Sequence, residues 1–327
     1  MKTRRFGRTG LQISELVFGG GWVGGILIHQ DEDTKRRAIR TALDGGINWI
    51  DTAADYGQGQ SELAIGALLA DLAPAERPSL STKVRLDLES NEDYASQIRR
   101  SLEVSLERLR MDRVALFQLH NPIALATGGG WIAVEEVLRD GGVADQLITL
   151  KDEGLVDHVG FTALGEAPSC IRVIDSGKVD TAQVYYNLLN PSAGRASLGG
   201  LEVQDFTGLI AACTRNDVGV MNIRTFAAGV LATDARHGRE IPITTEDDLD
   251  DEVRRAHAVI AALGDGHGTR AQTAIRFSLA HPGVSCVVVG LAELSHLEEA
   301  IAAAEKGPLP ASALAALEPV WEANFGL

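Results

Sequence analysis

Eight short apolar runs, separated by stretches with the apolar spacing of amphipathic helices, most constrain the fold of this 327-residue chain. Strands that alternate with helices pair in parallel, and eight such units favour an α/β fold of the closed (β/α)8 TIM barrel type. A doubly wound open sheet is the competing architecture, because periodicity alone does not separate the two. The runs lie at residues 16–20, 47–51, 79–83, 114–120, 157–162, 181–185, 218–223 and 285–289.

The stretches between the runs carry helix boundary signals of their own. Residues 33–43 have apolar side chains at helical spacing and end at Gly45-Gly46, a pair typical of a glycine-capped helix end. Residues 94–109 repeat the helical spacing. Both stretches therefore predict amphipathic helices.

The N-terminal segment predicts a closure for the barrel. The sequence FGRTGLQIS, which precedes the first run, indicates a β-hairpin that turns at Thr9-Gly10. Such a hairpin would close the bottom of a barrel. No Pro- or Ser-rich linker divides the chain, so we expect a single domain over residues 1–327.

Composition and charge limit the possible partners. Lys and Arg number 30 against 45 Asp and Glu, which gives a formal net charge of −15. Such a surface disfavours nucleic acid and anionic membranes, since both attract clustered Lys and Arg. No apolar run approaches the roughly 20 residues that span a bilayer, and the N-terminus MKTRRFGRTG lacks the apolar core of a signal peptide. We therefore expect a soluble, cytoplasmic protein.

The three cysteines give no sign of a crosslink or a metal centre. Cys170, Cys213 and Cys286 lie far apart and show neither CxxC spacing nor a Cys/His pattern. A disulfide framework and a zinc site are therefore not expected, and free thiols fit a reducing cytoplasm.

Two stretches depart from the strand–helix rhythm. Residues 121–142 form a long predicted loop directly after the fourth run, and residues 236–251 form a polar, acidic segment after the seventh. Loops of this length in a compact domain are commonly functional. The loops that follow the strands of a barrel surround its active mouth, so both are candidate substrate walls. An ordinary surface insertion is the alternative for either.

Four ionisable residues stand at or just after the ends of three consecutive runs: Asp51 and Tyr56 in NWIDTAADYG, Lys83 in SLSTK and His120 in VALFQLHNP. A Tyr is a poor proton donor at neutral pH, because its ordinary pKa is about 10. A Lys cation beside it favours the phenolate, an Asp keeps the Lys charged, and a His can hydrogen-bond a substrate oxygen. The set predicts a proton-transfer site for a carbonyl or an alcohol.

The barrel hypothesis makes these four residues neighbours. The carboxyl ends of barrel strands meet at one mouth, where barrel enzymes hold their chemistry. Each residue alone has an ordinary explanation, such as a helix cap, a surface ion pair or a structural histidine. Four suitable residue types at consecutive strand ends favour the catalytic interpretation.

The motifs DTAADYG, STK and LHNP, with the opening FGRTG and the C-terminal GVSCVVVGLAELSHLEEA, resemble those of the aldo-keto reductases nearly end to end. The resemblance implies a (β/α)8 barrel that binds a nicotinamide cofactor without a Rossmann domain. It implies that Tyr56 is the general acid in reduction and the base in oxidation. It also implies that Lys83, paired with Asp51, lowers the pKa of Tyr56. His120 would orient the substrate oxygen.

The same resemblance implies cofactor contacts at the nicotinamide end. Gln183 matches the residue that hydrogen-bonds the carboxamide, and Thr162 stands where many relatives carry a Ser. The seventh run lacks the usual aromatic that stacks on the nicotinamide, so Ile223 or Arg224 takes that place. A barrel-rim position is the alternative for Arg224. The other expected neighbours of the cofactor are Gly20, Gly21, Trp22 and Asp51.

The adenosine end favours NAD over NADP. Relatives specific for NADPH usually carry Lys or Arg after the last strand, whereas this chain has Glu293 near that place and His296 where an Arg often stands. A carboxylate repels a 2′-phosphate but accepts hydrogen bonds from a free ribose hydroxyl. The alternative for Glu293 is an acid that opens the last helix. Gly290 and Glu299 complete the expected contacts.

These features predict an oxidoreductase that transfers a hydride between NAD or NADP and an aldehyde, a ketone or an aldose. Within the family, the chain is most similar to the aldose dehydrogenases. A cofactor-binding regulatory subunit with little or no turnover is the alternative. An unrelated barrel hydrolase or lyase would need a metal-ligand cluster or an activated nucleophile that we do not find in the sequence. The substrate, the direction in the cell and the oligomeric state are not determined.

Overall fold

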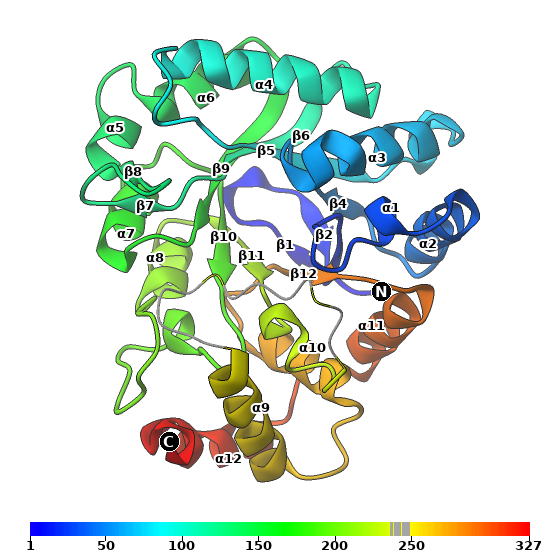
Figure 1. Cartoon of the computed structure of the whole chain (residues 1–327), viewed down its shortest axis with the longest axis vertical. Helices are drawn as coiled ribbons and strands as arrows, with labels where there is room; N and C mark the ends of the chain where they lie inside the picture. Colours follow the sequence, from blue (N-terminus) through cyan, green and yellow to red (C-terminus); the bar gives the residue numbers. More distant parts are fainter. Residues whose placement is uncertain (236–237, 239–242, 244–248) are drawn as a thin grey trace.

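The eight predicted runs become the strands of one closed parallel barrel (Figure 1). The computed structural model describes residues 1–235, 238, 243 and 249–327. The strand order is β3-β4-β5-β6-β9-β10-β11-β12, and the barrel closes where β12 pairs with β3. This closure confirms the predicted barrel and rules out the open sheet. The strands are β3 (Leu16–Gly19), β4 (Trp49–Asp51), β5 (Ser79–Val84), β6 (Val114–Leu119), β9 (Val156–Ala163), β10 (Thr181–Tyr185), β11 (Gly219–Ile223) and β12 (Cys286–Gly290).

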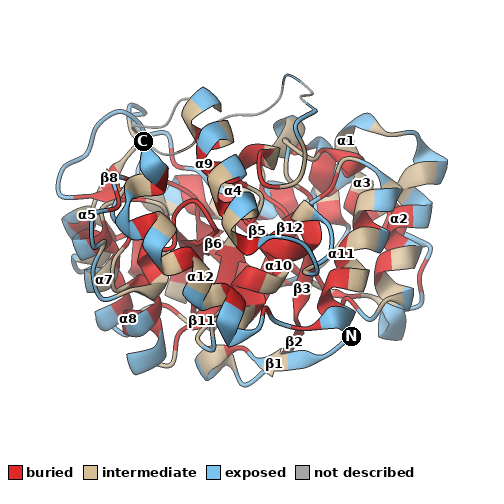
Figure 2. Cartoon of the chain, turned by 90° about the horizontal axis from the view of Figure 1, so that it is seen from below, coloured by how far each residue is buried: buried red, intermediate tan, exposed pale blue. Residues whose placement is uncertain are grey.

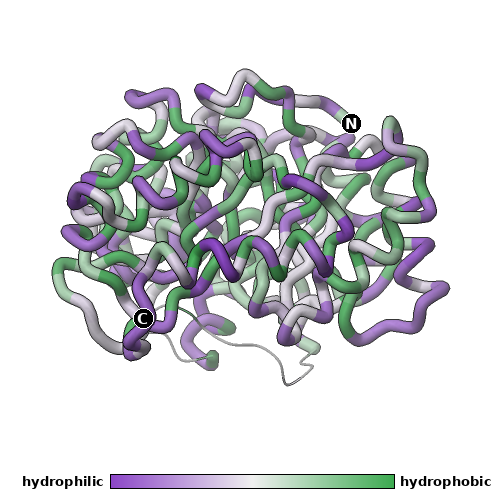
Figure 3. Tube along the Cα trace, turned by 90° about the horizontal axis from the view of Figure 1, so that it is seen from above, coloured by the Kyte–Doolittle hydropathy of each residue, from purple (hydrophilic) through white to green (hydrophobic). Residues whose placement is uncertain are grey.

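Helices surround the barrel and separate its strands from water. Figure 2 shows buried strands inside and exposed outer helix faces, and the chain trace in Figure 3 alternates between hydrophobic and hydrophilic stretches around the molecule. No helix within the described residues is both long enough and apolar enough to cross a membrane. The longer helices are α2 (Glu32–Asp44), α3 (Gln60–Ala70), α4 (Tyr94–Leu109), α6 (Val143–Asp152), α7 (Ala167–Asp175), α8 (Leu209–Arg215), α9 (Leu249–Leu263), α10 (Arg270–Ala280), α11 (Leu294–Lys306) and α12 (Ala311–Glu322).

Side-chain and glycine caps set the predicted helix boundaries. α2 begins after Asp31, whose carboxylate accepts a hydrogen bond from the amide of Thr34 at 2.9 Å. It ends at the predicted glycine pair, where Gly46 has a φ of 83° and its amide donates to the carbonyl of Leu43. α4 covers the predicted stretch in full and begins after the capping residue Asp93.

The N-terminal hairpin closes the amino-terminal end of the barrel, as predicted. β1 (Thr3–Arg5) pairs antiparallel with β2 (Gln12–Ser14), and Figure 2 shows both at the lower edge of the molecule. Phe6 is fully buried and packs edge-on against Trp49, with ring centroids 5.5 Å apart. A Cβ on Gly219, the first residue of β11, would lie 2.5 Å from the Phe6 ring. Only glycine therefore leaves room for this aromatic floor.

The two predicted loops have different outcomes. The predicted loop over residues 121–142 is more structured than expected, because Ile123 and Ile132 are fully buried and belong to short strands. Residues 236–251 lie mostly outside the described residues, and their last three positions belong to α9. The elements in the first segment are β7 (Ile123–Ala124), β8 (Ile132–Ala133) and α5 (Val134–Leu138).

Phe6→Ala should lower the free energy of unfolding by about 3–5 kcal/mol, because it removes a buried aromatic side chain and leaves a cavity. Urea denaturation measures the change. Leu125→Ala is the control: that side chain is 69% exposed, so its loss should stay within about 0.5 kcal/mol. Equal losses for both variants would show that the aromatic floor adds nothing to stability.

Candidate active site

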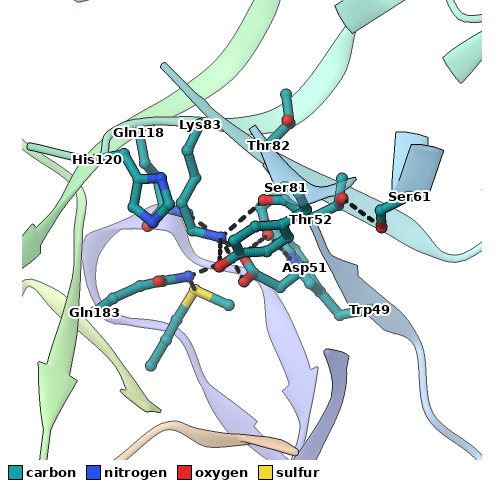
Figure 4. A network of polar contacts seen from close by, with 12 residues as sticks. Trp49, Asp51, Thr52, Ser61, Ser81, Thr82, Lys83, Gln118, His120 and Gln183 are labelled. Carbon is teal, nitrogen blue, oxygen red and sulfur yellow. Dashed lines mark hydrogen bonds and ion pairs between the residues drawn. The ribbon is translucent and has the colours of Figure 1, made fainter. Parts of the chain in front are cut away.

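The structure gathers Asp51, Tyr56, Lys83 and His120 at the carboxyl-terminal mouth of the barrel. Asp51 is the last residue of β4, Lys83 lies near the end of β5, and His120 directly follows β6. Tyr56 begins a 3-10 turn after β4. Figure 4 shows Asp51, Lys83 and His120 converging from their separate strands.

Lys83 and Asp51 form a buried ion pair at the centre of the site. Nζ of Lys83 lies 2.7 Å from Oδ2 of Asp51, and the two side chains are 0% and 4% exposed. The same Nζ donates to the carbonyl oxygen of Thr52 at 2.7 Å and to the Tyr56 hydroxyl at 3.4 Å. A buried ammonium group needs such partners, because an unpaired charge inside a protein costs several kcal/mol.

The net pKa shift of Tyr56 differs from the prediction. Burial raises the pKa of Tyr56 above its ordinary value, and the Lys83 cation opposes this rise without cancelling it. Burial acts to lower the pKa of Lys83, but Asp51 and Tyr56 outweigh it, so that pKa is raised. At neutral pH the ammonium is therefore charged and the phenol keeps its proton, as a proton donor must.

Several side chains that bond Asp51 were not predicted from the sequence, and one that was predicted as a cofactor contact also bonds Asp51. Oδ1 of Asp51 accepts hydrogen bonds from Ser81 at 2.6 Å, Gln183 at 2.8 Å and Gln118 at 3.5 Å. Nε1 of Trp49 donates to the Ser81 hydroxyl at 3.0 Å. Trp49, Ser81 and Gln118 each stand two positions before a predicted catalytic residue, and alternate residues of a strand share a face. That spacing was the signal for them.

His120 contacts Asp55, which the sequence reasoning passed over. Nδ1 of His120 lies 3.3 Å from Oδ1 of Asp55, and Oδ2 of Asp55 accepts a hydrogen bond from Nε of Arg85 at 2.8 Å. The rings of His120 and Tyr56 meet edge to face, with centroids 5.7 Å apart. Acids are common caps in turns that lead into helices, so no pattern in the sequence distinguishes Asp55.

The predicted glycines after β3 lie beside Asp51 and Tyr56. The amide of Gly20 donates to the carbonyl of Asp51 at 2.8 Å, which fixes this turn against β4. A Cβ on Gly21 would lie 3.8 Å from the Tyr56 ring, so the glycine keeps the space beside that ring open. Trp22 follows them and is 43% exposed.

Thr162 and Gln183, the residues predicted to contact the nicotinamide, have groups that could bond a carboxamide. Thr162 on β9 pairs in register with Gln183 on β10. Within the described residues, the buried hydroxyl of Thr162 has no hydrogen-bond partner, which costs free energy unless a ligand supplies one. A carboxamide offers both a donor and an acceptor. The amide nitrogen of Gln183 donates to Asp51, so the carbonyl oxygen of this side chain is the atom left to accept a hydrogen bond from a ligand.

Ile223 and Arg224 lie at the end of β11. Both are half-buried, and Arg224 has a left-handed backbone with a φ of 59°. A non-glycine residue in this conformation costs on the order of 1–3 kcal/mol and is often found at functional sites. Burial lowers the pKa of Arg224, while Tyr185 and Tyr56 oppose the fall.

The predicted adenosine-end residues surround the start of α11. Gly290 ends β12, and no atom lies within 4 Å of the position of a Cβ there. Glu293 is the N-cap residue of α11, but its exposed side chain makes no capping hydrogen bond. Glu293, His296 and Glu299 follow at intervals of three, so they share one side of the helix.

A closed parallel barrel with such a buried network at its mouth is the arrangement in which barrel enzymes hold their chemistry, and its acid and base groups suit proton transfer at a carbonyl or hydroxyl oxygen. Across the residues with described positions, no group of three or more His, Cys, Asp or Glu is arranged to hold a metal ion.

Residues 15–322 match the Aldo/keto reductase family, and the chain belongs to that family. It is 30% identical over 311 residues to D-threo-aldose 1-dehydrogenase from a Pseudomonas species, covering 86% of each chain. It is 27% identical over 305 residues to L-galactose dehydrogenase from Arabidopsis thaliana, covering 93% of this chain and 88% of that one. An aldo-keto reductase structure from Bacillus halodurans, in its holo form, has a TM-score of 0.75 at 22% identity and covers 98% and 96% of the two chains.

Family membership confirms the resemblance, and the two named dehydrogenases support the aldose dehydrogenase branch. The protein is an oxidoreductase that interconverts carbonyl and hydroxyl groups with a nicotinamide cofactor.

Lys83→Met should lower the free energy of unfolding by about 3–5 kcal/mol, because the Asp51 carboxylate stays buried without its cation. The double variant Asp51→Asn/Lys83→Met should recover part of this loss, since it buries no unpaired charge. Arg36→Met is the control: its pair with Asp71 is exposed on both sides, so its loss should stay below about 1 kcal/mol. Urea denaturation measures all three, and a double variant less stable than Lys83→Met would contradict the charge argument.

Proposed function

We propose that this protein is an NAD-dependent aldose dehydrogenase, which oxidises a sugar hydroxyl to a carbonyl and passes the hydride to the nicotinamide. The contacts of Lys83 with Asp51 and Tyr56 at the barrel mouth are the observation that carries the chemistry. The two sugar dehydrogenases, each matched over most of its length, support an aldose as the substrate class.

Tyr56 exchanges a proton with the substrate oxygen. Its phenol donates to a carbonyl in reduction, and its phenolate accepts the hydroxyl proton in oxidation. Lys83 stabilises the phenolate across their 3.4 Å contact, and Asp51 keeps Lys83 charged. His120 meets the Tyr56 ring edge to face and orients the same substrate oxygen. The bound cofactor supplies the hydride acceptor in oxidation and the hydride donor in reduction.

Residues at the nicotinamide end and at the adenosine end would hold the cofactor. Thr162 and Gln183 would bond the carboxamide, which gives the buried Thr162 hydroxyl a partner. Ile223 would pack against the ring, and Arg224 would pair with the pyrophosphate, because a guanidinium suits phosphate oxygens. The remaining contacts would come from Gly20, Gly21 and Trp22 near the nicotinamide and from Gly290, Glu293, His296 and Glu299 at the adenosine end.

The choice of NAD over NADP rests on Glu293. Its carboxylate is exposed and makes no capping bond, so it is available to the ribose 2′-hydroxyl. A 2′-phosphate at the same place would meet a like charge. α11 has no Lys or Arg before its last residue, Lys306, so it brings no cation of its own to balance that phosphate.

The segment of residues 121–142 is the proposed substrate wall. Asn121 follows His120 and holds the segment against the mouth: its side chain bonds both the amide and the carbonyl of Leu86, at 2.7 and 3.0 Å, just beyond β5. The same side chain reaches the carbonyl of Gly130 at 3.3 Å. A change in this segment therefore acts directly beside His120.

Tyr56→Phe should reduce turnover of an aldose with NAD at least about 100-fold, because it removes the proton-transfer group. Cofactor affinity, measured by fluorescence titration, should stay nearly unchanged. Tyr94→Phe, which removes a phenol hydroxyl at the start of helix α4, is the control and should keep full turnover. Loss of cofactor binding together with turnover would make Tyr56 a structural residue. A wild-type protein that binds cofactor but turns over no sugar or carbonyl would favour the regulatory-subunit alternative.

Glu293→Arg should tighten NADPH binding about tenfold, roughly 1.4 kcal/mol, because it exchanges a repulsion for an attraction. Parallel titrations with NADH and NADPH measure the change, and added salt should weaken it. Glu298→Arg, an exposed acid on the same helix, controls for net charge and should affect NADPH much less. Equal effects of the two variants would mean that Glu293 does not face the ribose.

A further inference from the structure

Tyr56 lies in a turn with an unusual backbone. Gly57, Gln58 and Gly59 follow it with φ angles of 58°, 55° and 91°, so three consecutive residues adopt the left-handed conformation. Residues with a side chain rarely adopt this conformation, and Gln58 keeps it only because the surroundings impose it. Contacts from outside the turn therefore hold it in place.

The guanidinium of Arg108, on α4, contacts the turn on both sides of Tyr56. Its Nη1 donates to the carbonyl of Ala54, two residues before the tyrosine, at 3.2 Å. A Cβ on Gly59, three residues after the tyrosine, would lie 2.4 Å from Cζ of Arg108, so the guanidinium packs directly against the backbone there. One rigid, planar group therefore limits the movement of the turn at both of its ends.

Glu62, the third residue of α3, joins this guanidinium to the strand β5. Its Oε2 accepts a hydrogen bond from Nη1 of Arg108 at 3.1 Å, and its Oε1 accepts one from the Thr82 hydroxyl at 2.6 Å. The side chain of Glu62 is 0% exposed and that of Arg108 is 27% exposed. Thr82 precedes Lys83 on β5, and its side chain points away from the centre of the network (Figure 4). Glu62 thus connects the turn of Tyr56 to the strand of Lys83.

This connection acts on the contact between Tyr56 and Lys83. The phenol hydroxyl lies 3.4 Å from Nζ of Lys83, near the outer limit of a hydrogen bond, so a small movement of the turn breaks the contact. The amide of Ala54 donates to the carbonyl of Lys83 at 3.3 Å, which is also a long bond. The link through Glu62 and Arg108 is charge-assisted and therefore stronger than either of these two contacts.

We propose that Glu62 and Arg108 are positioning residues that hold the Tyr56 hydroxyl within reach of Lys83. The proposal rests on the proposed function, in which Tyr56 exchanges a proton with the substrate oxygen. Glu62 and Arg108 lie on the helices outside the barrel and act through the turn and through β5. Their pair therefore fixes a distance at the mouth from the outer side of the barrel wall.

The position of the turn has an electrostatic consequence for Tyr56. The Lys83 cation opposes the rise that burial causes in the pKa of Tyr56. A turn that moves away from Lys83 weakens this opposition, so the pKa of Tyr56 rises further. The other charged or titratable groups that face Tyr56 in the described part of the chain are Asp51 at the end of β4, Asp55 in the same turn, His120 after β6 and Arg224 after β11.

The double variant Glu62→Gln/Arg108→Met tests the proposal in the full-length enzyme, because it removes the link without leaving a buried charge unpaired. One anion and one cation are lost together, so the net charge of the protein is unchanged. We expect kcat for aldose oxidation with NAD to fall about tenfold to a hundredfold, since a small misplacement of a reacting group has effects of this size. The Kd for NAD should not change.

Arg4→Met/Glu15→Gln is the matched control. This pair belongs to the N-terminal hairpin at the other end of the barrel, and its side chains are 23% and 5% exposed. Arg4 also donates to a backbone carbonyl, that of Val284, at 3.0 Å. The control should lose a similar amount of stability in urea denaturation but should keep kcat within about twofold.

A second measurement does not depend on turnover. The 13C NMR signal of Cζ of Tyr56, assigned by its absence in Tyr56→Phe, moves when the phenol loses its proton. In Glu62→Gln/Arg108→Met the pKa of Tyr56 should rise by about one unit, because the phenol moves away from the Lys83 cation. The control pair should leave this pKa unchanged, since a general loss of stability does not separate the phenol from the ammonium group.

Wild-type kcat or an unchanged pKa of Tyr56 in Glu62→Gln/Arg108→Met would overturn the proposal, and so would equal effects of the control pair. A wild-type protein that turns over no aldose would refute the proposed function instead, and the NMR comparison would still decide the role of the pair. If the double variant does not fold, Arg108→Lys takes its place with the same expected directions. Lys keeps a cation beside Glu62 but has one nitrogen and no planar face to pack on Gly59.

Discussion

The rest of the site depends on the ion pair between Lys83 and Asp51. Both charges are buried inside the barrel, where low polarisability strengthens their attraction but makes any unpaired charge costly. The surrounding side chains stabilise the buried carboxylate: Ser81, Gln118 and Gln183 all donate hydrogen bonds to one oxygen of Asp51. The ion pair therefore determines which residue types the inner face of the barrel can carry around Asp51.

The same network links the catalytic mouth to the barrel floor. Trp49 packs against Phe6 with its ring and donates from its indole nitrogen to Ser81, which in turn donates to Asp51. A continuous path of contacts thus leads from the N-terminal hairpin to the Asp51 carboxylate. The hairpin closes the barrel at one end and also helps to fix the position of a charge near the other.

The strand ends and the four residues at the barrel mouth could be predicted, because a period-two pattern and residue types can both be recognised in a single sequence. It could not predict that burial outweighs Lys83 in setting the pKa of Tyr56, since desolvation depends on packing from many segments. The contact between Asp55 and His120 joins two loops and leaves no local pattern. β7 and β8 were missed because two-residue strands have no measurable periodicity.

Barrel closure between β12 and β3 has a consequence for synthesis of the chain. Asp51, Lys83 and His120 leave the ribosome long before Gly290 and the start of α11. The edge of the first barrel strand stays unpaired until the last strand has been synthesised. Until then the nascent chain holds these three residues but not the residues that we propose contact the adenosine of the cofactor. A chain that stops early would carry the residues proposed for proton transfer without the complete site proposed for the hydride acceptor.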